Sequence, residues 1–334
     1  MYLLAIESSC DETAVAILGP APRLLASVVA SQVPVHQKFG GVVPEIASRQ
    51  HLLTLNPLLE QALQQAQLNW EHLGAVAVTR GPGLVGSLLV GVSAAKAIAW
   101  ALNIPLIGVN HLAGHIYANF LAHPGLELPA LCLVVSGGHT DLIYLPEHGR
   151  FERLGRTRDD AAGEAFDKVA RALGLGYPGG PLVDRLAREG NPEAISLPRA
   201  FLEEGSLDFS FSGLKSAVLN YLNRARQRGE EVNKADLAAA FQEAVIDVLV
   251  EKTLQAAGRT GVERILLAGG VAANSRLRQR LEERTQQAGL KLYYPPLDLC
   301  TDNAAMIGAA GWYLWQAGYR DDLYLNAEAN LPLV

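Results

Sequence analysis

The chain has few cysteines and no long uninterrupted apolar segment. Its three cysteines, Cys10, Cys132 and Cys300, are odd in number and far apart among 334 residues, which argues against a disulfide framework and fits a reducing compartment. No apolar run reaches the length of about 18 residues that a membrane helix needs, so we expect no membrane association. The first residues lack the basic segment of a signal peptide and predict a strand, which favours a cytoplasmic protein.

The chain also has no excess of positive charge. Its formal net charge is −6, from 28 Lys and Arg against 34 Asp and Glu, which argues against a protein that coats nucleic acid. A local basic patch can still bind RNA. Residues 36–51, which combine cations, an aromatic ring and hydrogen-bonding groups, and the arginine-rich residues 223–228 are the two candidates. The alternatives are a capped helix start for the first and a solvated helix end for the second.

Hydrophobic residues make up 49% of the chain, enough for two domains or one bilobal fold. Apolar runs on either side of a polar turn predict a β-hairpin at residues 3–18, and residues 130–145 repeat the pattern, which indicates an internal duplication. Residues 191–212 are polar, contain Pro and Gly, and are expected to be mobile. Helix and strand patterns alternate elsewhere, which predicts an α/β fold with mixed sheets in two lobes. Helices are expected at residues 50–67, 88–101, 163–173, 182–189, 213–226, 236–257 and 302–315.

Four glycine-rich turns lie between strands and helices, at residues 81–86, 136–138, 179–180 and 269–270. Such turns bring backbone N–H groups close to phosphate oxygens, so their recurrence predicts a nucleotide site. None matches G-x-x-x-x-G-K-[ST], which excludes a P-loop protein. Residues 81–86 are not a regular G-x-G-x-x-G followed by a ribose-binding acid, so a Rossmann dehydrogenase is poorly supported.

The most informative motif is the pair His111 and His115. Histidines four residues apart lie on one face of a helix and can bind one metal ion, although helix histidines also commonly bond only to backbone carbonyls. The intervening residues are Leu, Ala and Gly, so the glutamate of zinc proteases is missing. Asp302 is either the N-cap of the last helix or the carboxylate of a His₂-carboxylate set suited to Zn²⁺ or Fe²⁺.

Eight segments, in order along nearly the whole chain, resemble the TsaD family of tRNA N6-adenosine threonylcarbamoyltransferases. They include the histidine pair and the glycine-rich turns, and they lie at residues 36–51, 111–115, 136–140, 163–168, 176–181, 209–215, 268–275 and 301–305. The resemblance implies a bilobal actin/Hsp70/sugar-kinase-like (ASKHA) fold. It also implies transfer of the threonylcarbamoyl group from threonylcarbamoyl-adenylate to N6 of adenosine 37 in tRNAs that read codons beginning with A, with release of AMP.

The resemblance also implies the site residues. His111, His115 and Asp302 would hold one divalent metal ion, Fe²⁺ or alternatively Zn²⁺. The adenylate would be bound by Val134, Val135, Ser136, Gly137, Gly138, Asp167, Gly180, Asp184 and Asn274. Asp11 and Glu12, in the turn of the first hairpin, are possible catalytic residues, and the sequence identifies no general base for the N6 proton.

The implied partners are tRNA, a TsaB-like actin-fold paralogue and a TsaE-like P-loop ATPase. We expect one lobe at residues 1–109, completed by about 316–334, and a second lobe at residues 110–315 that carries the metal and most adenylate contacts. The alternative activity is that of a metalloendopeptidase of the glycoprotease type, which the histidine spacing suggests and the missing glutamate opposes.

Overall fold

A computed structural model describes residues 1–201, 203 and 205–334 of the chain. It divides into two compact units, the first formed by Met1–Leu126 with Pro295–Val334 and the second by Glu127–Tyr294. The expected boundaries at residues 109/110 and 315/316 therefore differ from those observed. The histidine-bearing helix and the last helix belong to the first unit, because both pack on its sheet and on each other.

The first unit is built on a mixed five-stranded sheet of order β3-β2-β1-β4-β5. The hairpin β1–β2 and strand β3 pair antiparallel, whereas β4 and β5 join β1 in parallel. The strands are β1 (Tyr2–Glu7), β2 (Glu12–Gly19), β3 (Arg23–Ser31), β4 (Leu73–Gly81) and β5 (Leu106–Asn110), and the helices are α1 (Val33–His36), α2 (Pro44–Ala66), α3 (Val85–Leu102), α4 (His111–Ala122) and α10 (Ala304–Gln316).

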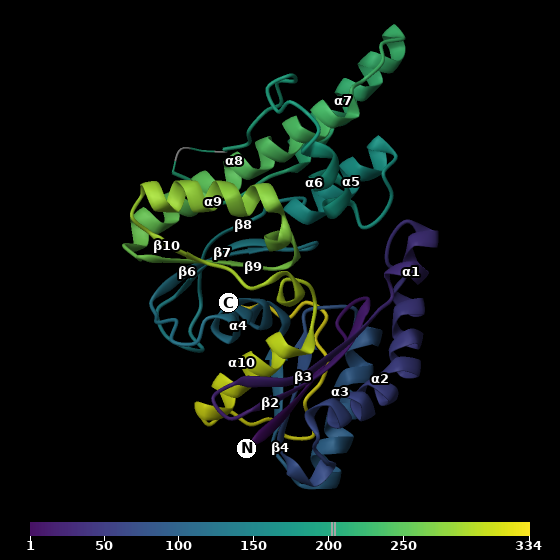
Figure 1. The fold of residues 1–334 in the computed structure, drawn as a ribbon, viewed down its shortest axis with the longest axis vertical. Coiled ribbons are helices and arrows are strands. Elements are labelled where there is room, and N and C mark those ends of the chain that lie inside the picture. Colours follow the sequence, from purple (N-terminus) through teal and green to yellow (C-terminus); the bar gives the residue numbers. More distant parts are fainter. Residues whose placement is uncertain (202, 204) are drawn as a thin grey trace. The chain divides into compact units, whose positions relative to one another are not determined.

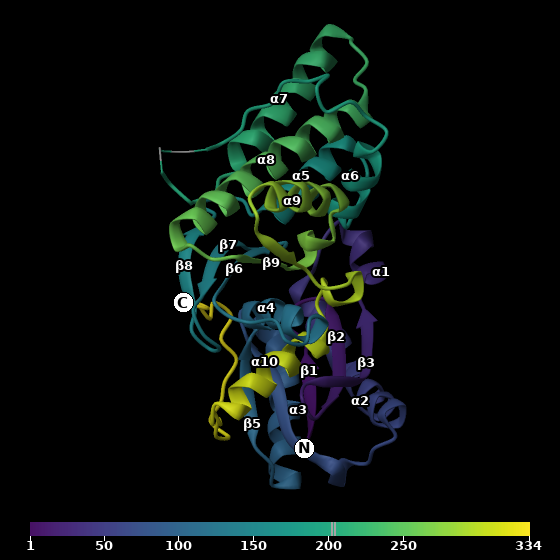
Figure 2. The same cartoon turned by 60° about the vertical axis from the view of Figure 1, so that its left-hand side comes forward.

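Helices cover both faces of this sheet (Figures 1 and 2). Helices α2 and α3 pack on one face, and α4 and α10 lie on the other. Helix α10 approaches the strands closely because it has glycine where they touch: a Cβ on Gly311 would lie 2.6 Å from Cβ of Ala77. The central strands β1 and β4 are mostly apolar and buried over most of their length, as expected of strands covered on both sides.

The second unit repeats the same plan, with a sheet of order β10-β9-β6-β7-β8. Strands β6, β7 and β8 are antiparallel, and β9 and β10 add in parallel beyond β6, so the hairpin β6–β7 takes the place of β1–β2. The elements are β6 (Ala130–Val135), β7 (Thr140–Leu145), β8 (Glu152–Arg156), α5 (Ala162–Leu173), α6 (Gly179–Ala187), α7 (Ser212–Arg228), α8 (Lys234–Thr260), β9 (Arg264–Ala268), α9 (Ser275–Gln287) and β10 (Lys291–Tyr293).

The segment expected to be mobile, residues 191–212, contains Leu202 and Glu204, which lie outside the described residues. Its described part is tied to α8 by the buried Lys252, whose Nζ donates to the backbone carbonyls of Phe201, Ser206 and Asp208. A lysine that satisfies three carbonyls gives this irregular segment a fixed anchor.

Within the described residues, one helix, α3, is long and apolar enough by length and composition to cross a membrane. Core helices of globular proteins pass the same test, and α3 packs on β4 and α2. This helix is therefore weak evidence for a membrane span.

Candidate metal centre and glycine-rich turns

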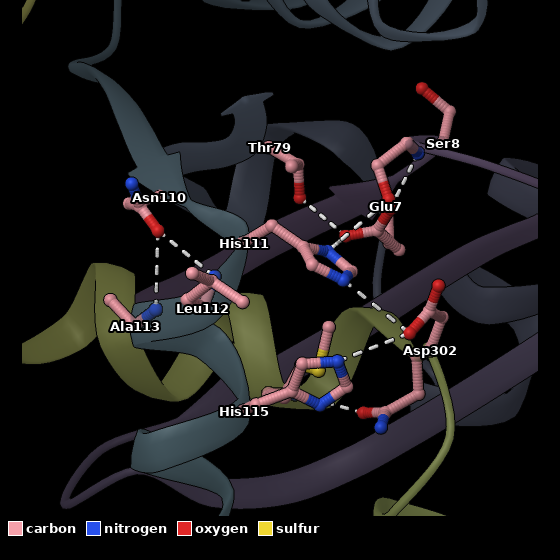
Figure 3. A network of polar contacts seen from close by, with 12 residues as sticks. Glu7, Ser8, Thr79, Asn110, His111, Leu112, Ala113, His115 and Asp302 are labelled. Atoms are coloured by element: carbon pink, nitrogen blue, oxygen red, sulfur yellow. Dashed lines mark hydrogen bonds and ion pairs between the residues drawn. The ribbon is translucent and has the colours of Figure 1, made fainter. Parts of the chain in front are cut away.

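The two histidines are placed by the start of α4. Asn110, the last residue of β5, is the N-cap, and its Oδ1 accepts hydrogen bonds from the backbone N–H groups of Leu112 and Ala113. The helix thus begins at His111, and His115 follows one turn later on the same face (Figure 3). The two rings lie edge to face with centroids 4.7 Å apart.

Asp302 meets both rings from the segment before α10. Its Oδ1 lies 3.5 Å from Nε2 of His111 and 3.2 Å from Nε2 of His115 (Figure 3). The N-cap of α10 is the next residue, Asn303, whose side chain accepts from the N–H of Met306. The capping role considered for Asp302 is therefore wrong, and its carboxylate is free to face the histidines.

The donor set fits a divalent metal ion. The ligand atoms of His111, His115 and Asp302 lie within 4.8 Å of one another. His115 is 1% exposed, and its Nε2 makes no hydrogen bond of acceptable geometry among the described residues, although Asp302 is close. A buried nitrogen without a partner is costly, and a bound cation would satisfy it. Two imidazoles and one carboxylate suit Zn²⁺ or Fe²⁺ and leave positions for other ligands.

Glu7, which the sequence analysis missed, supports His111 from behind. It is completely buried at the end of β1, where Oε1 accepts from the N–H of Ser9 and Oε2 accepts from Oγ1 of Thr79, both at 2.5 Å. Oε2 also lies 3.2 Å from Nδ1 of His111 (Figure 3). This contact holds the proton on Nδ1 and directs Nε2 toward Asp302. An acid that ends an apolar strand was the available signal.

The charges around His111 determine the ionisation of the cluster. Burial alone would lower the pKa of His111, but Asp302 and Glu7 outweigh it and raise that pKa well above the usual value. Burial would likewise raise the pKa of Asp302 and of Glu7, yet the His111 ring lowers both. The two carboxylates therefore favour the protonated, positively charged form of the His111 ring between them.

The turn after β1 brings two further acids near Asp302. Asp11 is buried, and Glu12 begins β2, where it accepts a hydrogen bond from Oγ of Ser31. Burial, followed by the charges of Asp302 and Asp11, raises the pKa of Glu12 to about 9. Cys10 is beside them, and burial raises its thiol pKa far above the usual range, which argues against a nucleophile.

The histidines at the ends of residues 36–51 have structural partners. His36 is buried and contacts Oε1 of Gln32. His51 is also buried, between Oγ1 of Thr13 and the carbonyl of Cys10. These two rings are therefore bound inside the protein and do not form an RNA-facing surface, although α2 starts at Pro44 without a side-chain cap.

In the second unit, the turn that follows β6 presents backbone N–H groups. Val134 and Val135 are the buried end of the strand, and the N–H of Ser136 donates to the carbonyl of His139 to close the turn. The N–H groups of Gly137 and Gly138 form no hydrogen bond with the described residues, and a Cβ on either would meet open space. These two donors are available to an anion.

Two more predicted residues meet at the start of α6. Oδ1 of Asp167 accepts a 2.7 Å hydrogen bond from the N–H of Gly179, and Gly180 follows in the first turn of the helix. A Cβ on Gly179 would lie 2.7 Å from Cα of Asp167, so glycine is needed for helices α5 and α6 to meet here. Asp167 thus caps the helix whose next turn carries Asp184.

Asp184 and Asn274 bond to residues that line a cavity of about 450 Å³ between α6, α8 and α9. The carboxylate of Asp184 accepts from Oγ of Ser275 and from Arg188, and both of these residues line the cavity. Asn274 is the N-cap of α9, and its Nδ2 donates to Oε1 of Gln242, another lining residue. Two of the predicted residues, Asp184 and Asn274, therefore adjoin this pocket through the side chains that line it.

The chain is similar in sequence to one family over nearly its full length. A sequence model of the TsaD family, described as tRNA N6-adenosine threonylcarbamoyltransferase, matches residues 23–309. The protein of that name from Moorella thermoacetica is 63% identical over 331 residues, which cover 99% of this chain and 97% of that protein. The one from Geobacillus thermodenitrificans is 61% identical over 335 residues, which cover 100% and 97%.

Among solved structures, component A of the (R)-2-hydroxyglutaryl-CoA dehydratase of Acidaminococcus fermentans is similar in fold. Its TM-score is 0.54 at 18% identity, over 96% of this chain and 100% of that chain. With the duplicated strand order of the two sheets, this likeness confirms the ASKHA fold expected from the sequence. The family match and the high identity over full-length relatives show that the chain belongs to the TsaD family of tRNA N6-adenosine threonylcarbamoyltransferases.

Proposed function

We propose that the chain transfers the threonylcarbamoyl group from threonylcarbamoyl-adenylate to N6 of adenosine 37 in tRNAs that read codons beginning with A, and releases AMP. The observation that carries this proposal is the convergence of His111, His115 and Asp302 in a member of this family. The substrate is a mixed anhydride with a good leaving group, so the protein mainly has to position it and stabilise developing charge.

His111, His115 and Asp302 are proposed to hold one divalent ion, Fe²⁺ or alternatively Zn²⁺. When bound, such an ion would supply a Lewis acid for oxygen atoms of the threonylcarbamoyl group. Glu7 keeps His111 in the tautomer that presents Nε2, and Asn110 fixes the start of the helix from which both rings project.

The adenylate is proposed to bind in the second unit. Ser136, Gly137 and Gly138 offer N–H groups to the phosphate, with Val134 and Val135 fixing the start of the turn. Asp167 and Asp184 are candidates for the ribose hydroxyls, and Gly180 and Asn274 for positions beside the adenosine. The support is the polar cavity that Arg188, Gln242 and Ser275 line next to Asp184 and Asn274.

Asp11 and Glu12 are proposed as the carboxyl groups that handle the N6 proton. Both are near Asp302, and Glu12 has a pKa of about 9 because burial and the neighbouring acids disfavour its charge. A carboxyl with so high a pKa holds a proton at neutral pH. Positive charge brought beside it would lower that pKa and release the carboxylate, which is the form that can accept the N6 proton.

Nothing in this arrangement favours a metalloendopeptidase. The residues between the two histidines carry no acid, and Glu7 is fully buried with both oxygens bonded inside the protein. It therefore lacks access to a water that would attack a peptide. The lack of an acid between the two histidines suits a site that must keep its activated substrate from hydrolysis.

The proposed partners are a TsaB-like actin-fold paralogue and a TsaE-like P-loop ATPase, in the cytoplasm. Apolar side chains on the outer side of α2 and α3 support a protein partner: Leu52 and Leu53 are 65% and 69% exposed, and Leu89 is 43% exposed. Leu52 and Leu89 also line one surface hollow. Such grouped apolar exposure is typical of an interaction surface.

The function is tested by incubating the chain with unmodified tRNA, threonine, bicarbonate, ATP, the upstream adenylate-forming enzyme and both partners. Mass spectrometry of the tRNA nucleosides should show threonylcarbamoyl-adenosine. The variant H111A should give none, while its far-ultraviolet circular dichroism stays unchanged. Full transfer by a variant that binds no metal would contradict the role of the histidine site.

A further inference from the structure

Helix α7 differs from the rest of this acidic chain in its charge. Its 17 residues include Lys215, Arg224, Arg226 and Arg228 and no Asp or Glu, whereas the whole chain has a net charge of −6. Figures 1 and 2 show α7 at the end of the second unit that is farthest from the unit's sheet. Positive charge is thus concentrated at one projecting element.

The N-terminal half of α7 is occupied by structural contacts. Asp159 accepts hydrogen bonds from the N–H groups of Phe211 and Ser212 and from the hydroxyls of Ser210 and Ser212. Lys215 is paired with Asp160 at 2.8 Å. These contacts fix the helix on its unit and leave the second half, residues 220–228, as the part that carries uncompensated charge.

The arginines in this second half are exposed and largely unpaired. Arg224 and Arg226 form no ion pair with the described residues, and Arg228 has only a 3.9 Å contact with Glu230. Glu230 and Glu231 follow the helix, so the excess positive charge centres on Arg224 and Arg226. Ala225, between them, is buried, and places one arginine on each flank of the exposed side.

The arginines of α9 provide a contrast within the same unit. Arg276 is held by two 2.8 Å hydrogen bonds to Glu243, and Arg278 donates to the carbonyl of Ala272. Arg280 and Arg284 lie near Asp247 and Glu251, at 3.8 and 3.2 Å. The arginines of α9 therefore pair with groups of their own unit, whereas Arg224 and Arg226 of α7 do not, within the described part of the chain.

The other exposed side chains of the second half are also of one kind. Asn220, Tyr221, Asn223 and Gln227 are exposed and lie among the arginines. Amide, phenol and guanidinium groups are the side chains that proteins use to contact phosphate and sugar oxygens of nucleic acids. Residues 220–228 thus present hydrogen-bond donors on the exposed side of the helix.

We infer that residues 220–228 of α7 bind the phosphate–ribose backbone of the tRNA substrate. The inference rests on the proposed function, which makes tRNA the substrate. Contacts of this kind hold the RNA without reading its sequence, and each phosphate neutralised releases a counterion and so makes binding salt-dependent. The surface would add affinity outside the site of transfer.

The test compares two double variants with equal change of charge. Arg224→Gln with Arg226→Gln removes the unpaired cations, and Arg280→Gln with Arg284→Gln is the control. Binding of a fluorescein-labelled, unmodified tRNA transcript is measured by anisotropy between about 50 and 200 mM salt. Loss of two phosphate contacts should lower the affinity by about eightfold for each contact at 0.1 M salt and reduce the slope of log K against log salt by about 1.8.

In the transfer assay with both partners, the α7 variant should raise KM for tRNA and leave kcat and the metal content unchanged. Equal tRNA affinity and salt slope in the two double variants would overturn the inference while leaving the proposed function intact. Absence of tRNA binding and transfer with the unaltered chain would instead overturn the proposed function and this inference with it. Loss of binding to phosphatidylserine vesicles with unchanged tRNA binding would identify α7 as a membrane-binding element and also overturn the inference.

Discussion

The substitution Glu7→Gln isolates the contribution of the carboxylate behind His111. The glutamine amide has nearly the shape of the carboxylate but no charge, and one of its two polar atoms is a donor. Both oxygens of Glu7 accept, from Ser9 and from Thr79 together with His111, so one of these donors would face an NH₂ group. The variant therefore loses both charge support and the fixed tautomer of the ring.

The size of the effect follows from the geometry. Glu7 does not touch the proposed metal position, and it acts through Nδ1 of His111 at 3.2 Å. Replacing such a supporting group typically lowers metal affinity by about 10- to 100-fold, which corresponds to about 1.4 to 2.7 kcal/mol. Removing a direct ligand should cost more than this.

Metal affinity is measured by competition for Zn²⁺ with a chromophoric chelator, and the Co²⁺-loaded protein gives an absorption spectrum that reports ligand geometry. Thr79→Val is the matched control, because it removes a hydrogen bond to Glu7 without touching His111. We expect a smaller loss in the control than in the Glu7 variant. A Zn²⁺ dissociation constant for Glu7→Gln within about twofold of the unaltered protein would refute the reasoning.

Three further outcomes are expected. His115→Ala should lower Zn²⁺ affinity by more than roughly 100-fold in the same titration, because it removes a direct donor, and retention of tight binding would mean that other residues hold the ion. Burial raises the pKa of Asp141 from 3.8 to about 6, so this carboxyl destabilises the fold progressively as pH rises through that range. Urea unfolding should therefore show Asp141→Asn to be more stable by up to about 3 kcal/mol at pH 8, with the gain vanishing near pH 4, and a gain that persists at acid pH would contradict this cause. Gly311→Ala should cost roughly 1–3 kcal/mol in the same assay, since the new Cβ would meet Cβ of Ala77 at 2.6 Å, and an unchanged midpoint would show that α10 can shift.

The repeated hairpins and the alternation of helix and strand were predictable because their apolar periodicity is local. The edge strands β8 and β10 of the second sheet were missed. Strand β10 has only three residues, and β8 is short and rich in charged residues, like a loop. Helix α2 begins at Pro44, six residues before the expected start at residue 50, in a position where proline favours a first turn. Pro44 thus marked the helix start in the sequence, but the polar residues next to it resemble a loop.

The sequence indicated the three residues of the candidate metal site but not the structural elements around them. Histidine spacing placed His111 and His115 on one face, and the structure brings Asp302 to them. Whether Asp302 or Asn303 caps α10 is decided by backbone geometry, which adjacent capping residues do not disclose. The packing of α4 and α10 on the first sheet is a long-range contact, which a local sequence pattern does not reveal.

The duplicated sheets have a consequence for how this protein can diverge. The equivalent hairpins β1–β2 and β6–β7 carry different functional groups. The turn of β1–β2 has acidic side chains and the carboxylate that supports His111, whereas the turn of β6–β7 has the backbone N–H groups of glycines. Each turn is supported by strands of its own unit, so a mutation that alters one leaves the scaffold of the other unchanged. After duplication of an ancestral repeat, the turns of the two copies could thus evolve separate functions. Relatives that share the fold can keep the function of one turn and change that of the other.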